Sequence, residues 1–290
     1  MTDKTRPSIG VAIIAHKRWL VSMRLLASLE ASTSLDGFAF HLFQDGAVNI
    51  FSGARTATDE EIAHSVRIFE QSSLPRKEVH EQEGNVGIGI IQLRATDYLA
   101  ENYSRIIVIE NDTALSPYFL GMAHHLFDDL ENQPATFSFN PGFRRGCSLG
   151  AIKVHMRELT PAWNHWNCEC FLAKNWARIR HLSTFEQYHE LIRNVEYPHR
   201  MNQQIRELFV RAGWRGETST TQDNARNVAI NEIGMKRMVL VVNRAINTGV
   251  VGLHIHPALY HKMGFGGQTP YVFESDATRE DFTWLSAQTS

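Results

Sequence analysis

The chain has 290 residues, of which 43% are hydrophobic and 21% are charged, and this composition excludes a largely disordered protein. Its 29 lysines and arginines nearly balance 31 aspartates and glutamates, so the formal net charge is −2. Such a balance argues against a protein whose main task is to bind nucleic acid or an anionic membrane surface.

Three features of the sequence predict a cytoplasmic protein without a membrane span. The apolar runs are all shorter than a membrane-spanning helix requires. The N-terminal residues lack the apolar segment of a secretory signal. The cysteines, Cys147, Cys168 and Cys170, are too few and of the wrong parity for a disulfide framework.

The first half of the chain alternates between strand-like and helix-like segments. Ile9 to Ala15 and Ile106 to Ile109 are apolar runs typical of buried parallel strands. Thr58 to Glu61 forms a capping-box pattern, and Ser116-Pro117 predicts another helix start. The alternation predicts an α/β fold with a mostly parallel sheet flanked by helices. The expected strands are 9–15, 38–43, 78–81 and 106–109, and the expected helices begin near residues 19, 58, 88 and 116.

After residue 135 the pattern changes, but no repeat or low-complexity linker separates the two parts, so we expect a single domain. An irregular tail rich in Gly and His ends the chain. The expected strands are 135–139, 149–155, 167–172 and 238–242, and the expected helices are 173–183, 185–194, 200–212 and 223–235.

Polar residues follow three of the expected strands: His16, Asp45 and the tripeptide Glu110-Asn111-Asp112. Ligands of open α/β sheets bind outside the carboxyl ends of the strands, so these residues are site candidates. Glu110 and Asp112 could gather around one hard divalent cation, since magnesium and manganese prefer oxygen ligands. The alternative is a polar turn that merely closes a strand.

The segment from Gly84 to Gly89 is a second candidate. Its glycines, Gly87 among them, and Asn85 lie at the start of an expected helix, and a helix N-terminus attracts phosphate. The spacing is not that of the dinucleotide-binding fingerprint. A loop that simply needs positive φ is the alternative. Arg94, two turns into the helix, could face a diphosphate or could be solvated.

Two further candidates lie in the second half. Asp223, at an expected helix start, is either a general base or a capping residue. His254 lies in a glycine-containing loop, where it could reach a ligand or metal or could make a structural hydrogen bond.

The order of these pieces resembles a GT-A fold glycosyltransferase, near the family-2-like and N-acetylglucosaminyltransferase-I-like groups. The segment from Ile107 to Phe119 is similar to the family's strand that ends in E-D-D and is followed by a proline and an aromatic residue. Weaker likeness extends to Gln222-Asp223 and to the segment that contains His254. The other matching stretches are residues 11–16, 43–46 and 85–87.

The resemblance implies a nucleotide-sugar-binding half at 8–135 and an acceptor-binding half at 136–290 with a flexible C-terminal tail. It places Asp45 near the uracil or ribose and Asp112 on a Mn²⁺ or Mg²⁺ ion that holds the diphosphate, with His254 as a second group for the metal or diphosphate. His16, Asn85, Gly87, Arg94, Glu110 and Asn111 would line the donor site. Asn111 departs from the family pattern, which has an acid there, so metal dependence could be weaker.

The function expected from this resemblance is metal-assisted transfer of a sugar from a nucleotide-sugar, with a UDP-sugar first, to a saccharide, glycolipid or other hydroxyl acceptor. Asp223 matches the general base of inverting members, and Glu169 is the next candidate for that role. Two alternatives remain open: a nucleotidyltransferase that makes a nucleotide-sugar, and a non-catalytic nucleotide- or carbohydrate-binding module. The nucleotidyltransferase would normally carry a glycine-rich loop after the first strand, where this chain has Ala15-His16-Lys17-Arg18.

Overall fold

The computed structural model describes residues 9–142, 154–162, 167–193, 195, 199–216, 219–250, 257–262 and 282–285. Its strands are β1 (Ile9–Ala15), β2 (Phe38–Gln44), β3 (Lys77–Glu81), β4 (Arg105–Glu110), β5 (Thr113–Leu115), β6 (Thr136–Asn140), β7 (Glu158–Ala162), β8 (Cys168–Leu172), β9 (Lys236–Leu240), β10 (Ala245–Asn247) and β11 (Thr283–Trp284). Its helices are α1 (Trp19–Glu30), α2 (Asp59–Gln71), α3 (Ile88–Asn102), α4 (Phe119–Glu131), α6 (Ala173–Arg180), α7 (Ser183–Ile192), α8 (Asn202–Arg211), α9 (Gln222–Glu232) and α10 (Pro257–Lys262).

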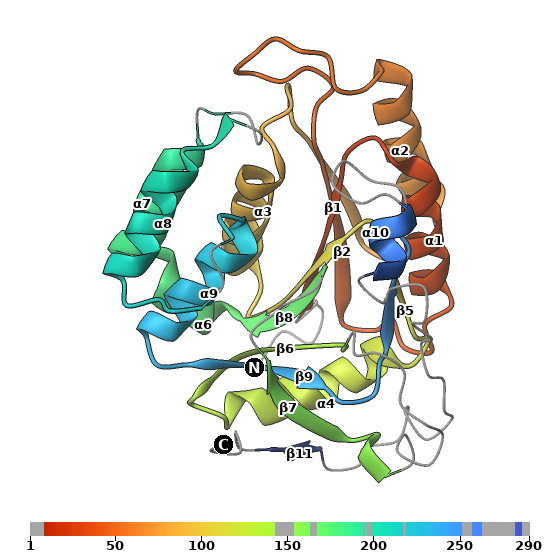
Figure 1. Cartoon of the computed structure of the whole chain (residues 1–290). Coiled ribbons are helices and arrows are strands. Elements are labelled where there is room, and N and C mark those ends of the chain that lie inside the picture. Colours follow the sequence, from red (N-terminus) through yellow and green to blue (C-terminus); the bar gives the residue numbers. More distant parts are fainter. Residues whose placement is uncertain are drawn as a thin grey trace.

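Nine strands form one mixed, mostly parallel sheet in the order β11-β7-β9-β6-β8-β4-β1-β2-β3 (Figure 1). Strands β4, β1, β2 and β3 are parallel neighbours, so their carboxyl ends share one edge. Strand β8 lies antiparallel between β4 and β6 and joins the two halves of the chain in this sheet. The short strands β5 and β10 form a separate antiparallel pair.

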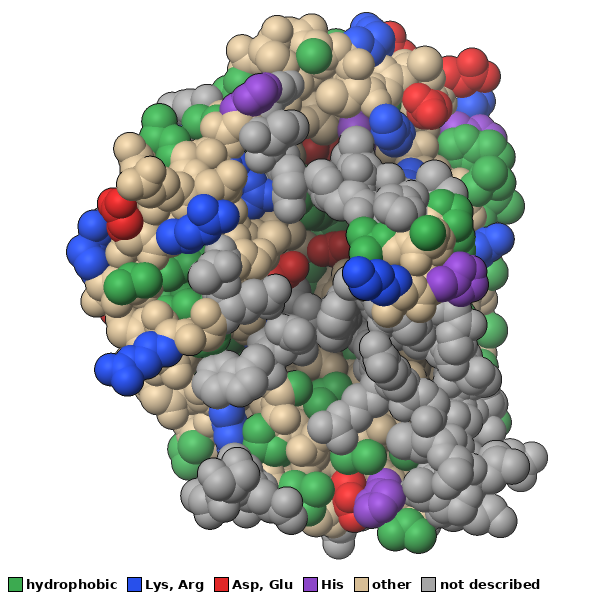
Figure 2. All heavy atoms as spheres, viewed as in Figure 1, with side chains coloured by type: hydrophobic (Ala, Val, Ile, Leu, Met, Phe, Trp, Pro, Cys, Tyr) green, Lys and Arg blue, Asp and Glu red, His purple; other side chains and the backbone are tan. Residues whose placement is uncertain are grey.

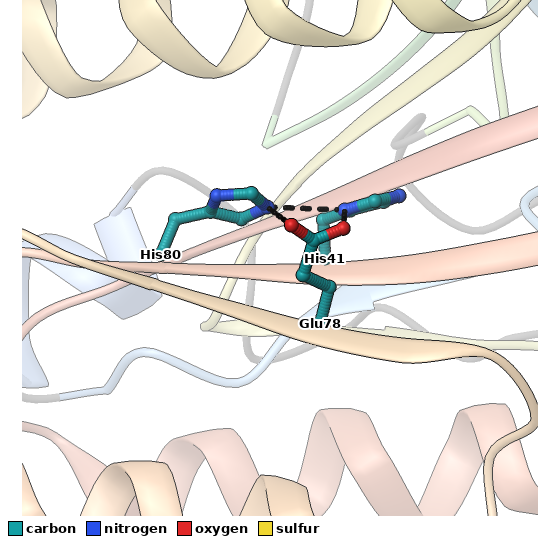
Figure 3. A group of neighbouring side chains, drawn as sticks. All are labelled: His41, Glu78 and His80. Atoms are coloured by element: carbon teal, nitrogen blue, oxygen red, sulfur yellow. Dashed lines mark hydrogen bonds and ion pairs between the residues drawn. The ribbon is translucent and has the colours of Figure 1, made fainter.

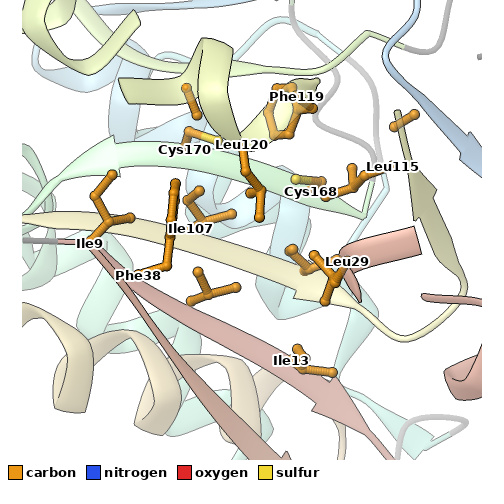
Figure 4. Packing of buried hydrophobic residues seen from close by; sticks show 14 of the residues in the cluster. Ile9, Ile13, Leu29, Phe38, Ile107, Leu115, Phe119, Leu120, Cys168 and Cys170 are labelled. Carbon is orange, nitrogen blue, oxygen red and sulfur yellow. The ribbon is translucent and has the colours of Figure 1, made fainter. Parts of the chain in front are cut away.

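Side chains of β1 alternate between two hydrophobic cores, as expected for a strand buried on both faces. Ile9 and Ile13 belong to the core beneath α1, α2 and α4, where they join Phe38, Ile107 and other apolar side chains (Figure 4). Ala12 and Ile14 belong to the core on the opposite face, beneath α3 and α6 to α9. Helices therefore cover both faces, and the α/β fold class is confirmed.

The expected elements of the first half are confirmed with small shifts of their ends. The capping box forms, because Thr58 Oγ1 accepts from the Glu61 amide at 3.1 Å and Glu61 Oε2 accepts from the Thr58 amide at 2.8 Å. The helix expected near Ser116-Pro117 is α4, but the expected cap is wrong. The N-cap is Tyr118, and Ser116 and Pro117 lie in the turn before it, where the Phe119 amide bonds to the Ser116 carbonyl at 3.0 Å.

In the second half, β6, β8, β9 and helices α6 to α9 correspond to expected elements. Most of the strand expected at 149–155 lies outside the described residues. The short strands β5, β7, β10 and β11 are not predicted by local sequence pattern. Within the described part of the chain, none of the helices combines the length and apolar character needed for a membrane crossing.

Candidate active site

The polar residues that follow β1, β2 and β4 meet at the shared carboxyl edge of these strands, as the sequence predicts. The backbone ties the three strand ends together: the Asp45 amide bonds to the Ala15 carbonyl at 2.9 Å, and the Asn111 amide bonds to the Ile14 carbonyl at 3.1 Å. Figure 2 shows acidic side chains at the bottom of a hollow in the middle of one face of the molecule.

Asp45 anchors the loop that leads into α3. Its Oδ1 accepts from the amides of Gly46 and Val86 at 3.1 and 2.8 Å. Its Oδ2 accepts from Asn85 Nδ2 at 2.9 Å and from the Gly87 amide at 3.1 Å. Burial raises the pKa of Asp45, and these hydrogen bonds oppose that rise by favouring the carboxylate. The buried carboxylate therefore fixes the shape of this loop.

His16 and Asn85 lie in the same network. His16 Nε2 is 3.1 Å from the Gly46 carbonyl oxygen and 3.3 Å from Asn85 Nδ2. Gly46 is required here, since a Cβ at this position would lie 2.4 Å from the backbone carbon of Gly84. Burial, with the charge of Lys17, lowers the pKa of His16. The structure thus brings together three residues that are far apart in the sequence.

Gly87 and Arg94 occupy different parts of α3. Gly87, at the N-cap, has φ of 83°, a conformation that glycine adopts without steric cost. Arg94 is exposed and donates to the side chain of Gln82, away from the carboxylate network, although its charge still lowers the pKa of Asp45. The structure therefore places Gly87 against Asp45 and leaves Arg94 on the surface beside it.

Asp112 is held by two side chains that sequence reasoning did not select. Arg18 Nη2 donates to its Oδ2 at 3.0 Å, and Asn167 Nδ2 donates to its Oδ1 at 2.7 Å. Asn167 has φ of 44°, which is uncommon outside glycine. Its carbonyl also accepts from the Glu110 amide at 2.7 Å. Asn167 therefore fixes both the end of β4 and the carboxylate that follows it.

Glu110 and Asn111 point to different surroundings. Gln92 Nε2 donates to Glu110 Oε1 at 2.8 Å. Burial raises the pKa of Glu110 well above its ordinary value, and the nearby carboxylates of Asp112 and Asp223 raise it further. Asn111 is buried, and its Nδ2 donates to Ser22 Oγ of α1 at 3.0 Å. Asn111 thus links the turn after β4 to α1.

Asp223 lies in the first turn of α9, but it is not the cap. The N-cap is Thr221, whose side chain accepts from the Asn224 amide at 3.3 Å. The alternative of Asp223 as the capping residue is therefore wrong. Because its charge contributes to the raised pKa of Glu110, Asp223 lies within electrostatic range of the β4 end.

Glu169, the next candidate for the base, is fully buried on β8. Arg226 Nη1 donates to its Oε2 at 2.7 Å, and Arg237 Nε donates to its Oε1 at 2.6 Å. A carboxylate sealed between two guanidinium groups cannot reach an acceptor. Glu169 is therefore a structural ion-pair residue.

His254 lies outside the described residues. The described segment before it contacts Asp112, and α10, after it, contacts that segment. The Thr248 amide bonds to the Asp112 carbonyl at 2.7 Å, and Tyr260 of α10 donates to the Asn247 carbonyl at 2.6 Å. Gly249 approaches most closely, because a Cβ there would lie 2.6 Å from Asp112 Oδ2.

The carboxylate oxygens of Glu110 and Asp112 are of the kind that a hard divalent cation prefers. Among the described residues, Glu110, Asp112 and Asp223 do not form a compact group of three ligand atoms. A cation on Asp112 would thus be completed by substrate phosphate and water, the usual arrangement for magnesium. To bind Asp112 Oδ2, the cation would also have to displace Arg18 from that oxygen.

Neither a protein-family model nor a curated protein sequence matches this chain. Solved structures are similar in fold. S. aureus TarS 1–349 in complex with UDP-GlcNAc is 11% identical, with a TM-score of 0.49 over 85% of this chain and 60% of that chain. GalNAc-T7 with UDP, GalNAc and Mn²⁺ is 11% identical, with a TM-score of 0.49 over 95% of this chain and 47% of that one. The mannosyltransferase PcManGT from Pyrobaculum calidifontis, in complex with GDP-Man and Mn²⁺, is 11% identical, with a TM-score of 0.44 over 80% of this chain and 70% of that chain.

Each of these likenesses is at 11% identity with a TM-score below 0.5, so it assigns no role to the residues of this chain. This chain spans 60% of the TarS chain and 47% of the GalNAc-T7 chain. The roles of its site residues are therefore assigned from its own geometry.

Proposed function

We propose that this chain is a glycosyltransferase that moves a sugar from a nucleotide-sugar, with UDP-sugars as the first candidates, to a hydroxyl group of a saccharide or other acceptor. The observation that carries the proposal is the placement of Glu110 and Asp112 at the carboxyl end of β4, beside the loop that Asp45 holds and within electrostatic range of Asp223. This arrangement offers a diphosphate site next to a carboxylate base.

The donor binds across the ends of β1, β2 and β4. The Asp45 network presents the loop before α3, and a helix N-terminus favours phosphate. His16 and Asn85 line the same place, and Arg94 adds positive charge at its margin. Asp45 acts mainly by holding the loop, because its oxygens already accept four hydrogen bonds.

The departing diphosphate gains negative charge as the glycosidic bond breaks. A divalent cation on Asp112, with Glu110 nearby, would neutralise that charge. Arg18, once displaced from Asp112 Oδ2, is a cationic group that can turn toward the same phosphates.

On the acceptor side, the hydroxyl oxygen bonds to the anomeric carbon while the bond from that carbon to the diphosphate oxygen breaks. The proton of the hydroxyl passes to the Asp223 carboxylate. Direct attack from the side opposite the diphosphate inverts the anomeric configuration. A positioned base of this kind contributes on the order of 10²–10⁴-fold in rate.

Thermal unfolding with a panel of nucleotide-sugars, with and without Mn²⁺, tests donor binding. A ligand that binds the native state raises its stability, by about 2.7 kcal/mol at a hundredfold excess over Kd. Asp112→Asn should lose the part of this stabilisation that depends on Mn²⁺. Asp128→Asn is the control, since Asp128 also pairs with an arginine, Arg105, but near the other end of β4.

Product analysis with two sets of substrates, the nucleotide-sugars alone and nucleoside triphosphates with sugar phosphates, separates the alternatives. A nucleotidyltransferase would release pyrophosphate from a nucleoside triphosphate and a sugar phosphate. A non-catalytic module would bind a nucleotide-sugar without ever cleaving it. Stabilisation by none of the nucleotide-sugars would contradict the proposal.

A further inference from the structure

A second cluster of metal-ligating side chains lies outside the candidate active site, on β2 and β3. His41 of β2 is the register partner of Glu78 of β3, and His80 lies two residues beyond Glu78 on the same face of that strand. Figure 3 shows the three side chains converging above the two strands. Within the described residues this is the one group of three His, Cys, Asp or Glu side chains whose ligand atoms all lie within 4.8 Å.

We propose that His41, Glu78 and His80 form a binding site for a transition-metal cation, with Zn²⁺ as the preferred ion. The ligand atoms would be His41 Nδ1, His80 Nε2 and one carboxylate oxygen of Glu78, with water as the fourth ligand. Two imidazoles and one carboxylate are a ligand set that zinc takes, whereas magnesium and manganese prefer oxygen ligands.

The spacing between the two histidine nitrogens and the Glu78 carboxylate, measured to either of its oxygens, is close to that around a tetrahedral ion. His41 Nδ1 lies 3.1 Å from His80 Nε2 and 3.5 Å from Glu78 Oε2, and His80 Nε2 lies 3.7 Å from Glu78 Oε1. Four ligands at zinc bond lengths of about 2.0–2.1 Å are separated from each other by about 3.3–3.4 Å. Small adjustments of these side chains would therefore place all three on one ion.

Tyr98 of α3 and Tyr103, the C-cap of that helix, orient two of the three ligands by hydrogen bonds. His41 Nε2 lies 2.8 Å from Tyr103 Oη, so a proton on Nε2 leaves Nδ1 free to ligate. Tyr98 Oη donates to Glu78 Oε2 at 3.0 Å. Such outer contacts fix the tautomer and direction of metal ligands.

The site has a buried side and an open side. The side chain of His41 is 2% exposed, whereas that of Glu78 is 52% exposed. An ion can therefore enter from solvent and retain a water. Because β3 is at the edge of the sheet, the ion would fasten this strand to β2.

The test uses the full chain, stripped of metal with a chelator and titrated with Zn²⁺ by calorimetry. The expected result is one saturable site per chain and a rise in melting temperature. His80→Gln and Glu78→Gln should each weaken binding at least about tenfold. Co²⁺ in the same site should give the visible absorption of a four-coordinate ion.

His181→Gln is the matched control, because exposed His181 pairs with Glu186 at 3.1 Å without a second histidine. This variant and Asp112→Asn should bind Zn²⁺ like the wild type. Absence of a saturable site in the wild-type chain, or equal binding by His80→Gln and Glu78→Gln, would overturn the proposal. Equal loss in His181→Gln would also overturn it, since the binding would then be spread over surface histidines. Should one ligand variant fail to fold, the other carries the test.

Discussion

Arg18 Nη2 lies 3.0 Å from Asp112 Oδ2, so a guanidinium group occupies the carboxylate oxygen that a donor-bound cation would need. The Asp112 side chain is 8% exposed and that of Arg18 is 31% exposed, so the arginine has room to leave while the aspartate stays. The ion pair holds Asp112 in position and would compete with the proposed cation for it.

Arg18→Gln should therefore change two affinities in opposite directions. Mn²⁺ alone should bind more tightly, because the competing guanidinium is gone. The nucleotide-sugar should bind more weakly, by about tenfold, because a charge-assisted contact with phosphate is lost. Calorimetry with Mn²⁺ and with UDP measures both. Arg105→Gln is the control, and parallel shifts of both affinities in Arg18→Gln would refute the competition.

Asp45→Asn should destabilise the protein and weaken donor binding together. The amide nitrogen of asparagine cannot accept the hydrogen bonds that one carboxylate oxygen now takes from Asn85 and Gly87. Leaving buried donors unsatisfied costs about 1–3 kcal/mol each. Urea unfolding measures the loss, and Asp128→Asn should lose far less. Wild-type stability in Asp45→Asn would contradict its anchoring role.

Gly249→Ala tests how closely the segment after β10 must approach Asp112. The added methyl would lie 2.6 Å from Asp112 Oδ2 and 3.1 Å from Arg18 Nη1, so the ion pair must shift. Donor affinity should fall about tenfold or more while the fold persists. Gly121→Ala is the matched control, because its nearest contact would be 3.6 Å. Donor affinity that is equal in both variants would show that the approach does not matter.

The fold and the outline of the site could be predicted from sequence, because both depend on local patterns. Apolar runs identified β1 and β4, and the polar residues after them marked the sheet edge. Arg18 and Asn167 could not be found in this way, since their role depends on contacts with Asp112 across 94 and 55 residues. The basic pair Lys17-Arg18 directly after the first strand is the local signal that points to Arg18.

Other features depend on register and on packing. The cluster of His41, Glu78 and His80 exists only because β2 and β3 pair in one particular register. Glu169 looked like a possible base in sequence because nothing local shows that Arg226 and Arg237 enclose it. Thr221 rather than Asp223 caps α9, a difference of two residues that sequence patterns seldom resolve.

The stability of the protein should fall in acid partly through His189. Burial lowers the pKa of His189 to about 4, and its Nδ1 lies 2.8 Å from the Phe185 carbonyl. The unfolded chain binds the proton from about pH 6.5 downward, whereas the folded chain resists it until about pH 4. The contribution of neutral His189 to the free energy of unfolding is thus fully present above pH 6.5 and is lost as the pH falls toward 4.

Urea unfolding from pH 7 to pH 4 measures this dependence in the wild type and in His189→Gln. The variant should show the smaller loss between these pH values, by up to roughly 3 kcal/mol. Identical slopes in the two proteins would remove His189 from the account.

The measurement that tests the proposed function most directly is cleavage of the bound nucleotide-sugar by the wild type and by Asp223→Asn, with donor affinity measured in parallel. The wild type should release the nucleoside diphosphate. Asp223→Asn should bind the donor and melt like the wild type, because Thr221 still caps α9, yet lose about 10²–10⁴-fold in turnover. Glu169→Gln should instead lose stability, by about 3–5 kcal/mol, because two buried guanidinium groups lose their counter-charge. Turnover by Asp223→Asn at the wild-type rate, or no cleavage of any bound nucleotide-sugar by the wild type, would contradict the account.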